Sequence, residues 1–429
     1  MILGILTFHS QTNYGGVLQC LALQQALQLF QNEKGEIRNE KLGCWIGGEC
    51  EGQNDVVVLD RWFDSCNSGL TSGTRLVISG RVNWTLLLRC CLGLGDASVR
   101  RRRLRTMAFL SKWMKLTPYH FVNWTDFGAN CQRAGCNPPD CLVVGSDQVW
   151  NMCSWADPRP YLLEGAPVSL RAISYAASFG RTTIPADMSE LYRSGLERFE
   201  QLSCREADGV RLCRELGFNA VHVVDPTLLL EREQWLRQFD LKEENRTTTK
   251  IRRLACYFIA EDLDMLFPKL EKFARQQKCR IDLFGDSPPR SWRINMPKNW
   301  HGIKVWLSAL RRRFFSPVRL RVDAGPVEFV RTLFSADAIV TDSFHAVMFS
   351  IIFKRNVRVL RPSTPGRKAM FARIEEFASH ATGSLIVDGF DAALNSLMVD
   401  EKVEFDDEWI ARRRAESLVW LRQALKGKG

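Results

Sequence analysis

The stretch Thr341-Asp342-Ser343-Phe344-His345-Ala346-Val347-Met348-Phe349-Ser350 places a histidine where an apolar strand gives way to a helix. Asp342 and Ser343 are both good helix N-caps, so His345 falls in the first helical turn. In open α/β sheets, ligands bind at the carboxyl ends of strands, beside helix N-termini that attract anions. A histidine there can give up a proton near neutral pH. The alternative is a structural histidine whose ring nitrogens are hydrogen-bonded within a buried turn.

Two sets of alternating strands and helices surround this stretch. The first set has apolar strands at 2–8, 142–144, 172–175 and 220–224, with helices at 17–27 and 188–201. The second set has strands at 254–259, 281–285, 338–340 and 357–360, with helices at 263–275, 371–377 and 409–425. This alternation favours a parallel, doubly wound sheet in each half. The sequence therefore predicts an α/β protein whose two domains face a cleft.

The length of 429 residues suits two domains of roughly 200 residues each. The first is expected over residues 1–240, and its Trp- and Arg-rich sequence at about 60–130 is interpreted as an insertion. The second domain, with the histidine, is expected over 250–405, and residues 406–429 should form a C-terminal helix.

The net charge of +11 indicates a polyanionic partner, a membrane surface or small anionic substrates. Much of the excess lies in two clusters, Arg100-Arg101-Arg102-Arg103 with Arg105, and Arg311-Arg312-Arg313 with Arg319 and Arg321. Such runs also occur on merely solvated faces. The sequence has neither zinc-finger spacing nor an aromatic RNA-binding signature, so no nucleic-acid partner is expected.

Fourteen cysteines lie scattered in apolar contexts, as the reduced core thiols of a cytosolic protein do. Cys131, Cys136 and Cys141 are evenly spaced and lack the tight pairing of a zinc site, so no metal is expected. The start at residues 1–8 lacks the features of a signal peptide, and no stretch reaches transmembrane length. A cytoplasmic location is expected.

A polar loop with two glycines follows the first strand. Asn13, Tyr14, Gly15 and Gly16 end this loop, whose glycines allow close backbone approach to a ligand. The next helix would point its amide groups at that ligand. The alternative is a simple tight turn.

A second polar loop carries Ser146, Asp147 and Gln148, with Trp150 and Asn151 just beyond. These side chains suit a hydroxyl-rich ligand, with Trp150 as a stacking surface. Asp147 could accept a proton from a sugar hydroxyl. Alternatively, Ser146 and Asp147 only cap a helix.

Two further loops complete the candidate set. Ser178 lies in the small-residue loop at 175–180, which could simply let the backbone pass. Arg205 follows a short strand, and its guanidinium can clamp a carboxylate or phosphate in bidentate fashion. A salt bridge to Glu206 or another acid is the alternative.

The order of these segments resembles the polysaccharide pyruvyl transferase family. The motifs are Asn13-Tyr14-Gly15-Gly16-Val17-Leu18-Gln19, Val144-Gly145-Ser146-Asp147-Gln148-Val149-Trp150-Asn151, Ser174-Tyr175-Ala176-Ala177-Ser178-Phe179-Gly180, Val224-Asp225-Pro226-Thr227 and Thr341-Asp342-Ser343-Phe344-His345. Gly325-Pro326-Val327-Glu328-Phe329 also fits. The resemblance runs from residue 2 to about 377, apart from the insertion and the stretch near 286–320.

The resemblance implies a glycosyltransferase-B-like arrangement of two Rossmann-like domains. It implies transfer of a pyruvyl group from phosphoenolpyruvate to a sugar of a cell-surface polysaccharide, such as an exopolysaccharide, or its lipid-linked precursor. The product is a ketal, and no cofactor is expected beyond the donor substrate. By resemblance, His345 is the donor-binding residue and general acid, and Arg205 binds the anion. Asp147 as the base toward the acceptor is an inference from chemistry alone.

One departure from the family concerns Ser343. In some characterised members an arginine stands at this position, two residues before the histidine. Helix amides, Arg205 or another arginine must then replace that anionic contact.

The acceptor is not specified by the sequence, and two other functions stay open. They are a glycosyltransferase that uses a nucleotide sugar and a non-catalytic glycan-binding relative. The arginine run Arg100 to Arg103 is a candidate contact with an anionic membrane surface, where lipid-linked glycans lie.

Overall fold

The computed structural model describes residues 1–9, 12–31, 55–61, 77–78, 81–82, 96–152, 157–243, 250–259, 261–285, 315–362, 365–398 and 402–427. The chain divides into two compact units, each discontinuous in sequence. Unit 1 comprises Met1–Ser72, Met107–Glu231 and Asp406–Gly429, and unit 2 comprises Gly73–Thr106 and Arg232–Phe405. The chain thus passes from unit 1 to unit 2 twice and returns to unit 1 for its last helix.

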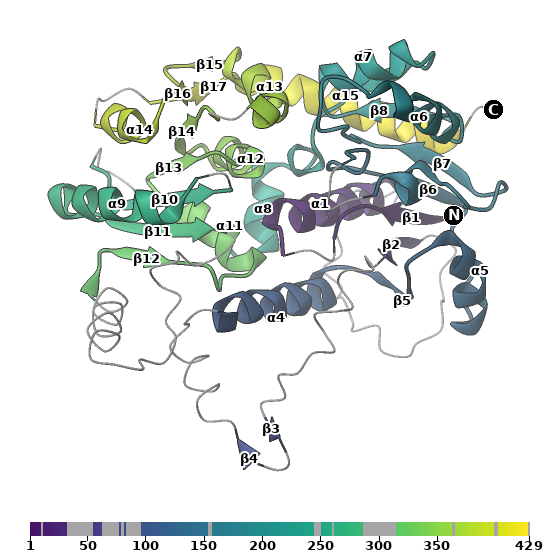
Figure 1. Ribbon diagram of the computed structural model, residues 1–429, viewed down its shortest axis with the longest axis horizontal. Coiled ribbons are helices and arrows are strands. Elements are labelled where there is room, and N and C mark those ends of the chain that lie inside the picture. Colours follow the sequence, from purple (N-terminus) through teal and green to yellow (C-terminus); the bar gives the residue numbers. More distant parts are fainter. Residues whose placement is uncertain are drawn as a thin grey trace. The chain divides into compact units, whose positions relative to one another are not determined.

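A parallel sheet of five strands forms the centre of unit 1, with the first strand of the chain in its middle (Figure 1). The strand order is β5-β2-β1-β6-β7, with bounds β1 Ile2–Leu6, β2 Asp55–Arg61, β5 Leu116–Phe121, β6 Cys141–Val144 and β7 Arg171–Ser174. Strands β1 and β6 are almost wholly buried. Strands with both faces covered read as continuous apolar runs, which is why the sequence predicts them.

The remaining elements of unit 1 surround this sheet. They are α1 Tyr14–Gln31, α5 Trp124–Arg133, η1 Arg159–Leu162, η2 Ala186–Met188, α6 Ser189–Leu196, β8 Leu202–Cys204, α7 Ala207–Glu215, β9 Ala220–His222, η3 Pro226–Leu228 and α15 Asp407–Lys426. Strand β9 was expected in the main sheet but pairs with β8 in a separate two-stranded sheet. Its side chains are partly buried or, at Val221, exposed, as is usual on a short peripheral strand.

The stretch at about 60–130, predicted to be an insertion, contributes to the main sheet of unit 1. Strand β5 pairs with β2, with a shift in register between Val58 and Asp60. Because β5 is an edge strand, it tolerates Pro118, which a central strand would exclude. The stretch also contains β3 Val77–Ile78, β4 Arg81–Val82 and helix α4 Asp96–Trp113. The insertion interpretation is therefore wrong for its last residues.

Unit 2 contains a parallel sheet of six strands, and Figure 1 shows β12 to β14 side by side in the order of pairing. The order is β12-β11-β10-β13-β14-β16, with bounds β10 Arg253–Phe258, β11 Arg280–Gly285, β12 Val318–Leu320, β13 Ala338–Thr341, β14 Asn356–Leu360 and β16 Ile386–Val387. In both units the chain starts in the middle of the sheet, moves to one edge and then crosses to the other side. The prediction of two Rossmann-like, doubly wound folds is confirmed.

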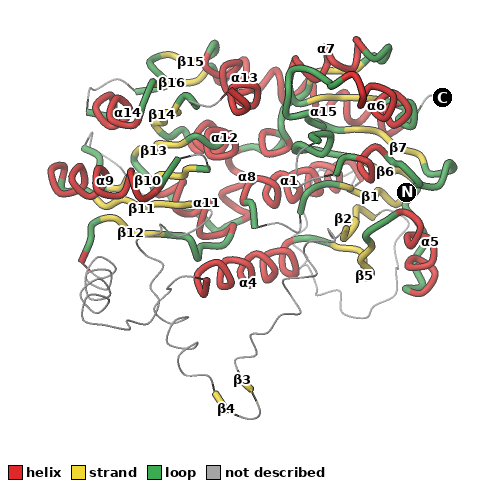
Figure 2. Tube along the Cα trace, in the orientation of Figure 1, coloured by secondary structure: helices red, strands yellow, loops and turns green. Residues whose placement is uncertain are grey.

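Helices alternate with the strands of unit 2 (Figure 2). The remaining elements are α8 Arg232–Gln238, α9 Leu263–Gln277, α11 Pro326–Ser335, α12 Phe344–Phe353, α13 Pro365–Ala378, β15 Ala381–Thr382, α14 Phe390–Ser396 and β17 Glu404–Phe405. Helix α11 begins as predicted, because the Gly325 amide donates to the Glu328 carboxylate at 3.0 Å. None of the helices in the described ranges is long and apolar enough to cross a membrane.

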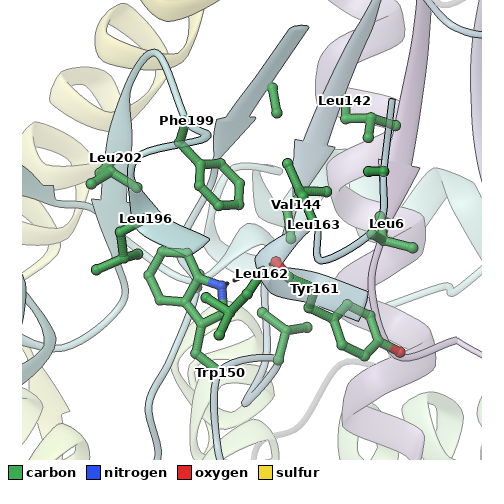
Figure 3. Close-up of a cluster of buried hydrophobic side chains, with 14 of the residues drawn as sticks. Leu6, Leu142, Val144, Trp150, Tyr161, Leu162, Leu163, Leu196, Phe199 and Leu202 are labelled. Carbon is green, nitrogen blue, oxygen red and sulfur yellow. Dashed lines mark hydrogen bonds between the residues drawn. The ribbon is translucent and has the colours of Figure 1, made fainter. Parts of the chain in front are cut away.

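The core of unit 1 includes Trp150, which the sequence offered as a stacking surface for a ligand. Figure 3 shows its ring among Leu162, Leu196 and Phe199. The indole Nε1 donates to the Tyr161 carbonyl at 3.3 Å, and the side chain is fully buried. The stacking interpretation is wrong, because the apolar ring contributes to packing instead.

Candidate functional site

The strand order of each sheet reverses between two particular strands. The reversal falls between β1 and β6 in unit 1 and between β10 and β13 in unit 2. Open α/β sheets bind ligands at this switch point, outside the carboxyl ends of the two strands. The predicted loop with Gly16 follows β1, the predicted loop with Asp147 follows β6, and His345 follows β13. Predicted residues from three separate stretches therefore lie at switch points.

In unit 1, hydrogen bonds join the two switch-point loops. Thr7 Oγ1 donates to the Ser146 carbonyl at 2.7 Å, and Gln19 Nε2 donates to Thr7 Oγ1 at 3.0 Å. A Cβ atom on Gly16 would lie 3.3 Å from Asp147 Oδ2, tighter than most such contacts. Glycine at position 16 thus lets the Asp147 carboxylate approach the first turn of α1, where helix amides favour negative charge.

The start of α1 is fixed by Asn13. Its Oδ1 accepts a hydrogen bond from the Gly15 amide at 2.9 Å, and its side chain is exposed. Tyr14 is 1% exposed and belongs to the core. Asn13 can therefore reach a ligand, whereas Tyr14 supports the loop from within.

Asp147 has a left-handed backbone with φ 71°. Its amide donates to Ser146 Oγ at 2.6 Å, and its Oδ1 accepts from the Gln148 amide at 2.9 Å. The residue is 8% exposed. Ala176, in the neighbouring loop after β7, is also left-handed at φ 52°. Non-glycine residues in this region cost about 1–3 kcal/mol and cluster at functional sites.

Ser178 joins the loop after β7 to the loop after β6, within which Gln148 makes a local contact. The Ser178 amide donates to the Asp147 carbonyl at 3.0 Å, and Ser178 Oγ accepts from the Gly180 amide at 3.1 Å. Gln148 Oε1 accepts from Asn151 Nδ2 at 2.7 Å. Ser178 is fully buried, so it positions the loop and its side chain does not reach a ligand.

Arg205 lies in a buried cluster of carboxylates. Its guanidinium donates to Asp225 at 3.0 Å and to Glu206 at 3.0 Å, and it lies 3.7 Å from Asp147 Oδ1. Burial alone would lower the pKa of Arg205, but Glu206, Asp225 and Asp147 together raise it above its ordinary value. One cation among three carboxylates repels an anionic ligand. The geometry favours the salt-bridge alternative, with Arg205 positioning Asp147.

Asp225 lies in one of the motifs that carry the resemblance, but the sequence analysis gave it no role at this site. It is fully buried and accepts from Arg205, from the Thr227 amide at 3.0 Å and from Thr227 Oγ1 at 2.7 Å. Ser146 Oγ also donates to it at 3.4 Å. The signal was present, since an aspartate before Pro226 is a typical N-cap with proline at the first helical position.

In unit 2, the loops after β10 and β13 are joined in a similar way. Thr341 Oγ1 donates to the Tyr257 carbonyl at 2.6 Å, and Asp342 Oδ1 accepts from the Ile259 amide at 2.7 Å. Ser343 is the N-cap by position, but its hydroxyl makes no capping hydrogen bond. Its amide donates to Thr341 Oγ1 at 3.0 Å.

His345 occupies the first turn of α12, as predicted. All ten residues of this helix are buried, and His345 is 7% exposed. Its ring meets the Phe344 ring edge to face, with centroids 5.3 Å apart. A small exposed fraction at a helix N-terminus is compatible with contact to a small ligand and excludes a freely solvated histidine.

The predicted site residues therefore form two groups. Unit 1 brings together Gly16, Ser146, Asp147, Gln148 and Arg205, with Asn13 at the adjacent helix start and Ser178 beneath. Unit 2 holds Asp342, Ser343 and His345. Within the described ranges, no three His, Cys, Asp or Glu side chains gather as metal ligands.

The arginine run on α4 is largely engaged within unit 2. Arg102 is buried and donates to the Gly285 carbonyl at 3.1 Å, and Arg101 pairs with Asp323 at 3.2 Å. Arg100 is exposed and Arg103 half-buried. Arg101 and Arg102 thus contact other residues of unit 2, and the membrane contact of the run stays a prediction.

Comparison with known proteins gives a family and several distant structures. The model of the family "Polysaccharide pyruvyl transferase" matches residues 93–364. The Methanocaldococcus jannaschii UDP-GlcNAc 2-epimerase in complex with UDP-GlcNAc and UDP is similar, with TM-score 0.48 and 12% identity over 98% of this chain and 100% of that chain. The UDP-N-acetylglucosamine 2-epimerase of Rickettsia bellii has TM-score 0.48 and 9% identity over 99% and 95%. MurG of Acinetobacter baumannii has TM-score 0.40 and 8% identity over 97% and 94%. No curated protein matches the chain.

Proposed function

The chain belongs to the polysaccharide pyruvyl transferase family, and on that premise we propose that it moves a pyruvyl group from phosphoenolpyruvate to a sugar. The sugar is part of a cell-surface polysaccharide or its lipid-linked precursor. The observation that carries the proposal is the family match over residues 93–364, which includes both Asp147 and His345.

The donor requires a proton source and an anion-binding site. Phosphoenolpyruvate carries a phosphate and a carboxylate, and the first amides of α12 favour such negative charge. His345, in that first turn, protonates the methylene carbon of the donor as general acid. The central carbon then becomes oxocarbenium-like and accepts a sugar hydroxyl.

The acceptor requires a base. Asp147 takes the proton of the attacking hydroxyl as the new carbon–oxygen bond forms. The bond between the central carbon and the phosphate oxygen then breaks, and inorganic phosphate leaves. The leaving phosphate takes the proton held by Asp147. A second sugar hydroxyl attacks the same carbon and closes the ketal, and its proton returns to His345. Arg205 and Asp225 act through Asp147 as positioning residues.

Calorimetric titration with phosphoenolpyruvate tests the donor assignment. We expect the wild-type protein to bind it, His345→Ala to lose binding, and His380→Ala, a histidine of unit 2 outside the switch point, to bind like the wild type. Unchanged affinity in His345→Ala would remove the histidine from the donor site. Binding of a nucleotide sugar in place of phosphoenolpyruvate would instead favour a glycosyltransferase.

We also propose a cytoplasmic location with peripheral membrane contact. The eight described cysteines are free thiols, which suits a reducing compartment. On α4, Arg100 and Leu104 are exposed, Leu104 at 67%, and they supply the charged and apolar contacts of an interfacial helix. We expect the double variant Arg100→Ser/Leu104→Ser to lose binding to anionic liposomes. The control Arg159→Ser should keep it. Equal binding of both variants would exclude this surface.

A further inference from the structure

The donor site proposed above needs a positive side chain near the start of α12. A phosphate and a carboxylate on one small molecule carry more negative charge than helix amides alone neutralise. Ser343 is neutral, and Arg205 is surrounded by Asp147, Glu206 and Asp225. The cation must come from another element.

Helix α13 supplies an arginine to this position. α13 packs against α12, and the guanidinium carbon of Arg373 lies 4.6 Å from the centroid of the Phe344 ring. The same ring meets His345 edge to face at 5.3 Å and Phe377 at 6.4 Å. The Phe344 ring therefore contacts both the guanidinium and the imidazole.

Neighbouring arginines of unit 2 have other positions. Arg361 pairs with Glu375 and Asp388, both at 3.0 Å. Arg355 stacks on Phe334, beside the opposite end of α12. Arg373 is thus the arginine that these contacts place at the first turn of α12, within the described part of unit 2.

The stacking on Phe344 suits anion binding. A guanidinium that lies over an aromatic face is held in one orientation, while its N–H groups remain in the plane and can donate to two oxygens. Asp342 is the carboxylate at this turn, and its Oδ1 accepts from the Ile259 amide. That hydrogen bond favours the ionised carboxylate. The turn therefore carries a negative charge, which a guanidinium nearby offsets when an anion binds.

We propose that Arg373 binds the phosphate group of the donor, together with the first amides of α12 and His345. It is a specificity-determining residue that replaces the positive charge missing at Ser343. The inference rests on the proposed function for the identity of the donor. The family match ends at residue 364, so it does not itself point to Arg373.

The test compares Arg373→Gln and Arg373→Lys with Arg361→Gln, which removes a neighbouring arginine already paired with two carboxylates. Calorimetry measures the affinity of each variant for phosphoenolpyruvate and for inorganic phosphate, and circular dichroism checks folding. We expect Arg373→Gln to weaken both ligands about tenfold to a hundredfold. Arg373→Lys should fall between, because lysine keeps the charge and loses bidentate geometry, and Arg361→Gln should bind like the wild type.

The outcomes separate the inference from the proposed function. Equal affinity of folded Arg373→Gln and wild type overturns the inference and leaves the donor assignment intact. If the wild type binds phosphate but not phosphoenolpyruvate, and Arg373→Gln no longer binds phosphate, the result supports the anion site. It overturns phosphoenolpyruvate as the donor. Absence of binding of either ligand to the wild type overturns both.

Discussion

The role of Arg205 depends on ion pairs that its neighbours in the sequence do not predict. An arginine after a short strand suggests an anion clamp, but its guanidinium is 1% exposed and lies among three carboxylates from positions 147, 206 and 225. These partners are up to 58 residues away along the chain, so no local pattern reveals them. The cation stabilises a site whose remaining charge is negative. That charge suits proton acceptance by Asp147 better than anion binding.

Replacing Arg205 by alanine should strongly destabilise unit 1. Removal of the cation leaves three carboxylates buried together, and breaking such a cluster costs about 3–5 kcal/mol. Urea unfolding at pH 7 measures the loss. The loss of unfolding free energy should be smaller near pH 5, because the unpaired carboxylates can then take up protons.

Arg211→Ala is the matched control for Arg205→Ala. Arg211 pairs with Asp208 and Glu215 on the exposed face of α7. Exposed pairs contribute about 1 kcal/mol or less. A similar loss for both variants would contradict the buried-cluster argument.

The raised pKa of Tyr175 should make the free energy of unfolding depend on pH. Burial raises its pKa well above the ordinary value, with Asp225 adding to the effect, and its hydroxyl donates to the Val224 carbonyl at 3.0 Å. The unfolded chain loses this proton near pH 10 and the folded chain only at higher pH. The folded state is therefore fully favoured below about pH 10 and loses up to about 1.4 kcal/mol per pH unit above it.

Tyr175→Phe tests this pH dependence. At pH 7 it should cost about 1 kcal/mol through the lost hydrogen bond. Between pH 10 and 11 its unfolding free energy should fall less steeply than that of the wild type. Parallel curves in urea unfolding would show that Tyr175 ionises normally.

At the scale of elements, the predictions succeed for the strands that flank the two switch points and are incomplete elsewhere. Strands β1, β6, β10 and β13 are buried on both faces, so their apolar runs are unambiguous. Strand β5 is an edge strand containing Pro118, and no continuous apolar run marks it. The predictions also omit β2, although its run Val56-Val57-Val58-Leu59 carries the same signal as the central strands.

The junction after β6 depends on Gly145. Its φ is +109°, and a Cβ atom there would lie 2.4 Å from the Tyr175 carbonyl oxygen. Gly145→Ala should therefore cost more than about 2 kcal/mol and disturb the loop that carries Asp147. Thermal unfolding of the variant and the wild type measures the change.

Gly128→Ala is the control for the substitution at the junction. Gly128 lies within α5 with no atom near its would-be Cβ. Alanine there should stabilise by up to about 1 kcal/mol, because it is the better helix former. Destabilisation of the same size in both variants would contradict a specific backbone requirement at Gly145.

At the scale of the whole molecule, the fold and the switch-point residues can both be predicted because they depend on local sequence patterns. Strand–loop–helix junctions are local in sequence, so Asp342, Ser343 and His345 can be placed before any contact is known. Contacts between distant segments cannot be placed this way. The pairing of Arg205 with Asp225 and the stacking of Arg373 on Phe344 both depend on how separate elements pack.

The return of the chain from unit 2 to unit 1 gives the last prediction. Helix α15 follows β17 of unit 2 yet packs in unit 1, where Arg171 donates to the Ala424 and Leu425 carbonyls, both at 2.9 Å. Its Ser417 Oγ accepts from the Val224 amide at 3.0 Å. Among its buried side chains are Trp409, Ile410, Leu421 and Leu425, each worth about 1.5–3 kcal/mol when fully buried.

Deleting residues 406–429 should therefore destabilise unit 1 and leave unit 2 folded. Hydrogen exchange should accelerate in β6 and β7 and stay slow in β10 and β13, since α15 belongs to unit 1. A chain ending at Lys426, which keeps the whole helix, should exchange like the full-length protein. Acceleration in β10 and β13 as large as in β6 and β7 would mean that the two units unfold together. The units would then have no separate free energies of unfolding.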